Sequence, residues 1–221
     1  MSRVVIVTPH PDDETLGCGG TILKHISRGD EVYWLIVTSM GDRFPDNIKD
    51  KRNLEIIEVA KQYQFSDVYQ LNQAASQLDS LPKGELISKI STVFSEVKPN
   101  VVYVPYPSDI HSDHKEVFEA TMACTKWFRY PHVEKILAYE TLSETDFTID
   151  PDANGFRPNV FINISQYLRK KIEIMSIYES EIESFPFPRS VKAIESLAYV
   201  RGAASGVDAA EAFMLLKERI L

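Results

Sequence analysis

The sequence predicts a doubly wound α/β fold, in which helices cover both faces of a mostly parallel sheet. Short β-branched runs alternate with segments of helical apolar spacing, as in right-handed β-α-β crossovers. The runs are apolar almost throughout, which is expected of strands covered on both faces. The chain has 221 residues, 44% hydrophobic and 25% charged, so it resembles a globular domain that buries a substantial core.

Six short runs are predicted to be strands. Each is rich in Val, Ile, Leu or Tyr, and each precedes or follows a segment with helical spacing. They are VVIV from Val4, VYWLIV from Val32, VYQL from Val68, VVYV from Val101, ILAY from Ile136 and VFINI from Val160.

Helical spacing of apolar residues occurs between these runs, at residues 16–26, 54–63, 86–97, 117–128 and 168–182. A further stripe at Ala209, Ala212, Phe213, Leu216 and Ile220 predicts a helix at the C-terminal end. No low-complexity linker or repeat divides the chain. We therefore expect one domain over residues 1–221, with about 151–221 forming a helical extension of it.

Charge and composition exclude several classes of function. The formal net charge is −8 and no Lys/Arg run is present, which argues against a nucleic-acid partner. Cys18 and Cys124 are too few for a disulfide framework and fit a reducing compartment. No signal peptide or membrane-spanning stretch is found, so we expect a cytoplasmic protein without a membrane partner.

Two predicted strands end in loops that are dense in metal-ligand residue types. The first loop is residues 9–14 (PHPDDE), and the second is residues 106–114 (YPSDIHSDH). Because parallel strands end at one edge of a sheet, the two loops can meet in space. Imidazole and carboxylate groups together suit zinc, and a catalytic zinc takes three protein ligands.

The first loop alone has a simpler explanation. Asp12 or Asp13 could cap a helix N-terminus, where Glu14 is favoured by the helix dipole. The second His-rich loop, at the end of another strand, favours a metal site over this explanation.

The glycines at 17–20 do not predict a dinucleotide site. Ile22 stands where a dinucleotide loop needs its third glycine, and Thr38 and Ser39 stand where an acid is expected. We expect these glycines to let the first helix pack close to the sheet.

Several motifs together resemble one family, the PIG-L/LmbE metal-dependent N-deacetylases. In chain order they are HPDDE, LGCGGTILKHISRG, Gly41 with Asp42, Arg52 with Glu55, HSDH, and RGAASGVDAAEAF. The resemblance spans nearly the whole chain. It implies a Rossmann-like fold, usually with zinc, and removal of acetyl from N-acetylglucosamine-type sugars joined to inositol, malate, another sugar or an antibiotic aglycone.

The resemblance also implies roles for single residues. His10, Asp13 and His114 would be the metal ligands and Asp12 the general base. We expect one Zn²⁺ per chain, with Fe²⁺ or Co²⁺ as alternatives.

Two further positions correspond to substrate-binding positions of the family. These are Arg52, which could instead form a surface pair with Glu55 or Glu58, and Asp42, where the family commonly has Glu.

The residue types around the second loop extend this interpretation. His111 lies three residues before His114 and could stabilise the oxyanion or act as an acid. Asp113 or Asp109 could orient His111 by a hydrogen bond.

The chain departs from the family at Pro9, where Ala is usual, and at Ser112, where Pro is frequent. These changes leave the proposed ligands intact and affect loop shape and substrate fit. Some members use a tyrosine at the oxyanion, for which Tyr106 is only a candidate.

The expected function is hydrolysis of an acetamide on a small amino-sugar conjugate. Alternatives are an amidase acting on a larger amide, a phosphoesterase, and a sugar-binding module without turnover. Family members often form trimers or hexamers, so we expect a homo-oligomer. Residues 183–190 (ESFPFPRS) could line the pocket mouth or a subunit contact, although an ordinary loop packed on the body is favoured.

Overall fold

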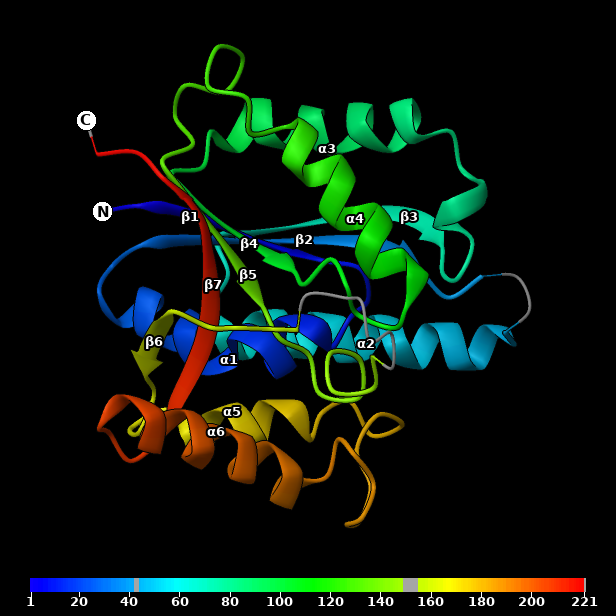
Figure 1. Ribbon diagram of the computed structural model, residues 1–221. Coiled ribbons are helices and arrows are strands. Elements are labelled where there is room, and N and C mark those ends of the chain that lie inside the picture. Colours follow the sequence, from blue (N-terminus) through cyan, green and yellow to red (C-terminus); the bar gives the residue numbers. More distant parts are fainter. Residues whose placement is uncertain (42–43, 149–154, 221) are drawn as a thin grey trace.

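We describe a computed structural model of the chain, which covers residues 1–41, 44–148 and 155–220. Within these residues, one seven-stranded sheet has the order β3-β2-β1-β4-β5-β7-β6 (Figure 1). β1 to β5 are parallel, and β7 is antiparallel to both of its neighbours. The strands are β1 (Arg3–Thr8), β2 (Glu31–Ser39), β3 (Asp67–Ala74), β4 (Val101–Pro105), β5 (Lys135–Tyr139), β6 (Val160–Asn163) and β7 (Ala210–Glu218).

Helices cover both faces of the sheet, which confirms the predicted fold class (Figure 1). α3 and α4 pack on one face and α1 and α2 on the other; α5 packs against α1, and α6 lies beside α5 and contacts β6 and β7. Within the described ranges, no helix is both long and apolar enough to span a bilayer. The helices are α1 (Asp13–Ser27), α2 (Asp46–Tyr63), α3 (Lys83–Val97), α4 (Ser112–Ala123), α5 (Leu168–Met175) and α6 (Val191–Ser205), with a short 3₁₀ turn, η1 (Leu78–Ser80).

The apolar run of β1 fills two cores at once. Val4 and Ile6 pack with the core on the α1 side, whereas Val5 and Val7 pack with the core on the α3 and α4 side. All four side chains are fully buried. Since neither face is open to solvent, the strand gains from an apolar residue at every position.

The predicted C-terminal helix is wrong, because these residues form β7. This strand lies between β5 and β6, and Phe213 is paired with Tyr139 on one side and Val160 on the other. A short run that is apolar on both faces has no period to separate strand from helix, and its Ala, Leu and Glu residues favour helix locally. Strand pairing overrides that local preference.

The expected helical extension at about 151–221 is therefore also only partly correct. Its described part contains α5 and α6, but β6 and β7 join the main sheet. α6 was not anticipated from the sequence, and it packs against both of these strands.

A buried ion pair joins Lys171 of α5 to Glu211 of β7, and both side chains also bond to the backbone of α1. The Lys171 ammonium donates to Glu211 at 2.7 Å and to the Leu16 carbonyl at 2.8 Å. The other contacts of the Glu211 carboxylate come from the backbone of α1, where the Gly20 and Thr21 amides donate to it at 2.9 and 2.8 Å. Both charged groups of the pair thus have several hydrogen-bond partners, as buried charges require.

Glycines let α1 approach the sheet closely. A Cβ on Gly17 would lie 2.3 Å from Cδ2 of Tyr139, and one on Gly20 would lie 2.6 Å from Cβ of Ile164. The Tyr139 ring cannot move away easily, because its hydroxyl donates to the Val7 carbonyl at 3.0 Å and the residue is fully buried.

Gly17→Ala is expected to lower the free energy of unfolding by about 1 to 3 kcal/mol, as overpacking of a rigid core does. Urea denaturation measures this change. Gly84→Ala is the matched control, since it also lies in a helix but has no atom within 4 Å of its would-be Cβ. It should stabilise the protein slightly. Equal stability of the two variants would contradict the packing argument.

Candidate metal centre and active site

The candidate site lies where the strand order reverses. β1 pairs with β2 on one side and with β4 on the other, so the loops that follow β1 and β4 flank the switch point of the sheet. The amide and the hydroxyl of Thr38 both donate to the Pro9 carbonyl, at 2.9 and 2.7 Å. These bonds fix the start of the first loop at the end of β1.

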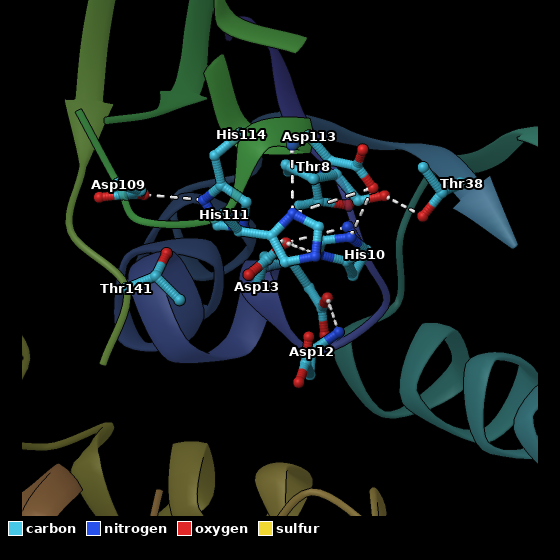
Figure 2. Close-up of polar contacts among 12 residues, drawn as sticks. Thr8, His10, Asp12, Asp13, Thr38, Asp109, His111, Asp113, His114 and Thr141 are labelled. Carbon is cyan, nitrogen blue, oxygen red and sulfur yellow. Dashed lines mark hydrogen bonds and ion pairs between the residues drawn. The ribbon is translucent and has the colours of Figure 1, made fainter. Parts of the chain in front are cut away.

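His10, Asp13 and His114 come together as the sequence predicts (Figure 2). Each offers one ligand atom, and these atoms all lie within 4.8 Å of one another. The Asp13 carboxylate is central, because its Oδ2 lies 3.5 Å from Nδ1 of His10 and 3.5 Å from Nε2 of His114. Two imidazoles and one carboxylate are the combination of side chains with which catalytic zinc can be bound, so this group could hold a metal ion.

A carboxylate holds the outer nitrogen of each imidazole (Figure 2). Nε2 of His10 donates to Asp113 at 3.1 Å, and Nδ1 of His114 donates to Asp109 at 2.7 Å. Asp109 in turn accepts from the Thr145 hydroxyl at 2.6 Å. In the neutral rings these bonds keep the proton on the outer nitrogen, so the inner nitrogen that faces Asp13 can bind a metal, which is the usual support of metal-bound histidines.

Asp113 was predicted to orient His111, but its carboxylate is directed at His10. Its Oδ2 lies 4.0 Å from Nδ1 of His111, against 3.1 Å from Nε2 of His10. The backbone amides of Ser76 and Leu78 donate to the same carboxylate, at 2.7 and 3.3 Å. His10, His111 and Asp113 also lie close enough together to hold an ion. However, the hydrogen bonds of Asp113 indicate that it supports His10 instead.

The cluster fits a cation. Nε2 of His114 is buried and has no hydrogen-bond partner among the described residues. Burial lowers the pKa of an imidazole, yet the hydrogen bonds to Asp113 and Asp13 outweigh it and raise the pKa of His10 to about 10. Burial likewise opposes the charge on Asp13, but His114 and His10 lower the pKa of Asp13 to about 2. The pocket therefore favours positive charge, for which a metal ion competes with protons.

Asp12 is turned away from this cluster by an unusual backbone. Its φ of 128° and ψ of −29° are rare for a residue with a side chain. Glu14 accepts from the Asp12 amide at 3.0 Å, and the Asp12 carbonyl accepts from the amides of Thr15 and Leu16 at 3.0 and 2.9 Å. Asp12 is the N-cap of α1, but its side chain makes no capping bond. The simpler explanation, a side-chain cap by Asp12, is thus excluded.

The Asp12 carboxylate faces the cavity instead. Burial and the charge of Asp13 raise the pKa of Asp12 well above its usual value, although Arg189 and Arg52 act in the opposite direction. Nη1 of Arg189 donates to Oδ2 of Asp12 at 3.0 Å. A buried carboxylate with a raised pKa beside a possible metal centre is suited to accept a proton.

His111 is placed to donate a hydrogen bond into the cavity. As N-cap of α4, its Nδ1 accepts from the Asp113 amide at 3.1 Å, so the proton of the neutral ring lies on Nε2. Burial and the charge on His10 lower the pKa of His111. Its ring centroid lies 4.5 Å from that of His10. A neutral His111 therefore offers an N–H close to the candidate metal ligands.

Arg52 reaches the cavity but is largely engaged by the protein. It is buried, and its guanidinium donates to the Pro11 carbonyl at 3.2 Å and to Glu181. It also contacts Ser180 at 2.9 Å and Glu55 at 3.3 Å. The pairing with Glu55 considered from the sequence is present, although it is buried rather than at the surface.

The cavity has a volume of about 220 Å³ and lies directly over the cluster. Asp42, the other expected substrate residue, lies outside the described residues. Tyr106 is buried against Phe156 and is not one of the described residues that line the cavity. The apolar part of the lining consists of Pro11, Leu16, Met40, Phe44 and Ala75.

The sequence did not identify Glu144, Glu181 and Arg189, which also line the cavity. Arg189 belongs to the FPFPRS stretch, for which an ordinary packed loop was favoured. It lies 177 positions from its partner Asp12, so no local spacing connects the two. Only the three-dimensional fold reveals this contact.

Two proteins of known sequence are similar to this chain over most of its length. The chain is 26% identical over 213 residues to the diacetylchitobiose deacetylase of Thermococcus kodakarensis, covering 86% of this chain and 72% of the relative. It is 25% identical over 192 residues to the probable N-acetyl-α-D-glucosaminyl L-malate deacetylase 2 of Bacillus cereus, covering 82% and 84%.

Among solved structures, the 4-carboxy-2-hydroxymuconate hydratase of Pseudomonas putida superposes with a TM-score of 0.74 at 16% identity, covering 100% of this chain and 98% of the other. At that identity only the fold is shared, and the fold alone does not determine the reaction. The family model described as PIG-L: GlcNAc-PI de-N-acetylase matches residues 5–125, a range that contains His10, Asp13 and His114. Since this match covers more than half of the sequence, the chain belongs to the PIG-L family.

Proposed function

We propose that this protein is a metal-dependent hydrolase that removes the acetyl group from an N-acetylglucosamine-type sugar or conjugate. The observation that carries the proposal is the buried Nε2 of His114, which has no hydrogen-bond partner among the described residues and faces Asp13 and His10 beside the cavity-facing carboxylate of Asp12. Membership of a de-N-acetylase family and the names of the relatives support the acetamide as the target.

We assign the metal to Nδ1 of His10, the carboxylate of Asp13 and Nε2 of His114, with zinc as the expected ion. A divalent metal bound there supplies Lewis-acid chemistry, since it polarises the amide carbonyl and makes water more acidic. Asp109 and Asp113 keep the two imidazoles in the tautomers that this binding requires.

The remaining chemistry falls to two side chains. Asp12 takes a proton from the attacking water and returns it to the leaving nitrogen, so the products are a free amine and acetate. His111 donates from Nε2 to the amide oxygen as negative charge develops on it. Arg52 is also a proposed substrate contact. Among the described residues its Nη1 donates only to the Pro11 carbonyl, so its second N–H is available to a substrate oxygen.

The test is a panel of N-acetylated amino sugars and conjugates, incubated with zinc-loaded and metal-free protein. Free amine and acetate should appear in equal amounts, and only with the metal-loaded form. Release of an acid other than acetate would favour the amidase alternative. A protein that holds metal but releases no amine from any member would favour the sugar-binding alternative.

Asp12→Asn should lower kcat by about a hundredfold or more while metal content stays at one ion per chain, because an amide cannot accept the proton. Steady-state kinetics and elemental analysis measure the two quantities. Asp50→Asn, at an exposed position of α2, is the control and should match the wild type. Full activity in the Asp12 variant would remove it as the base.

His114→Ala should lose both metal and activity, since one of three ligands is gone. Asp109→Asn should retain the ligands but weaken metal binding by about 10- to 100-fold, as loss of such a support usually does. Competition with a zinc chelator measures both. His132→Ala, before β5 at the opposite edge of the sheet, is the control. Stoichiometric zinc in the His114 variant would exclude that residue from the ligand set.

A further inference from the structure

Arg189 connects the candidate base to the C-terminal third of the chain. Its Nη1 lies 3.0 Å from Oδ2 of Asp12 and 3.0 Å from Oε2 of Glu181. The side chain of Asp12 is only 7% exposed, so this contact takes place in a largely desolvated environment. There a charge-assisted hydrogen bond is stronger than at an open surface.

Glu181 holds Arg189 in turn and is itself held by Arg52. The second carboxylate oxygen of Glu181 accepts from Arg52, which also donates to the carbonyl of Pro11, the residue before Asp12. Arg189 packs over the Phe187 ring at 5.7 Å. The guanidinium that contacts Asp12 is therefore fixed from several sides, and the network closes on the loop that carries Asp12.

Among the described residues, Arg189 is the one hydrogen-bond donor to the Asp12 carboxylate, and Arg52 supports its charge only at longer range. Its Oδ2 accepts from Arg189, and none of the described residues donates to Oδ1, which therefore stays available to a reacting water. The bond from the Asp12 amide to the Glu14 carboxylate holds the main chain of Asp12 and does not involve its side chain. Arg189 is thus the group that sets where this carboxylate points.

We propose that Arg189 is a positioning residue that holds the Asp12 carboxylate in its reactive orientation, with Glu181 as its anchor. The catalytic part of this inference rests on the proposed function, in which Asp12 is the base. The family match ends at residue 125, so this contribution comes from outside the matched region.

A competing role follows from the same residue. Nε of Arg189 is buried and has no hydrogen-bond partner among the described residues. A substrate oxygen bound there would make Arg189 a binding residue, and its loss would then raise KM rather than lower kcat.

The experiment compares Arg189→Met, Arg189→Lys and Glu181→Gln with the wild type. Arg189→Met should lower kcat by about 10- to 100-fold with little change in KM, because a small misplacement of a catalytic group costs that much. Arg189→Lys should recover part of this loss, and Glu181→Gln should lose less than Arg189→Met. Lys192→Met removes the same charge near the segment, where Lys192 packs over Phe185, and should have no effect. An unchanged kcat with a raised KM would overturn the proposal.

A double variant links Arg189 to Asp12. In the Asp12→Asn background, Arg189→Met should cause no further loss of kcat, since the group it positions is no longer a base. Losses that multiply would overturn the positioning role. If Asp12→Asn itself is fully active, the base assignment has failed, and that result is distinct from a failure of the inference.

A crystal structure of Arg189→Met tests the proposal without an activity assay. The Asp12 carboxylate should occupy more than one rotamer or leave its wild-type position, while His10, Asp13 and His114 keep theirs. A cooperative thermal unfolding transition establishes that the variant is folded. If it is not folded, the crystal structure of Arg189→Lys is used in its place. An Asp12 side chain that keeps its single wild-type position in the variant would overturn the proposal even if no substrate is known.

Discussion

Three consecutive acids at the end of a buried strand require separate neutralisation, because like charges at close range repel strongly in a desolvated site. Each acid is stabilised by a different set of partners. Asp13 faces two imidazoles, Asp12 faces Arg189, and Glu14 accepts from the Asp12 amide and the hydroxyls of Thr15 and Tyr178. Burial raises the pKa of Glu14 to about 7, although these hydrogen bonds oppose it. The separate partners give three neighbouring carboxyl groups three different environments.

The sheet topology brings these partners together. The loops after β1 and β4 contribute the candidate metal ligands from opposite sides of the switch point. The Thr38 hydroxyl donates to the Pro9 carbonyl in the first loop, and the Ser76 amide donates to the Asp113 carboxylate in the second. The segment between α5 and α6 then supplies Glu181 and Arg189 from the outer layer. The site thus combines residues from distant parts of the chain, and no single sequence motif contains all of them.

The sequence predicted what depends on the regular geometry of a parallel sheet. His10 and His114 follow two strands that end at one edge, so their convergence could be expected. The partner of Asp113 could not, because side-chain direction within a loop is set by contacts rather than spacing. Arg189 escaped detection for the same reason, and β7 was misread because an apolar run with good helix formers has no distinctive period.

The position of β7 also has a consequence for biosynthesis. β6 is bonded to the sheet through β7, and β7 follows β6 by a long stretch that includes α5 and α6. During translation, the edge of β5 must therefore stay open until the last strand leaves the ribosome, and an open edge invites pairing with other chains. A nascent chain of this topology is therefore expected to need chaperone protection for a longer time than a chain whose strands join the sheet in sequence order.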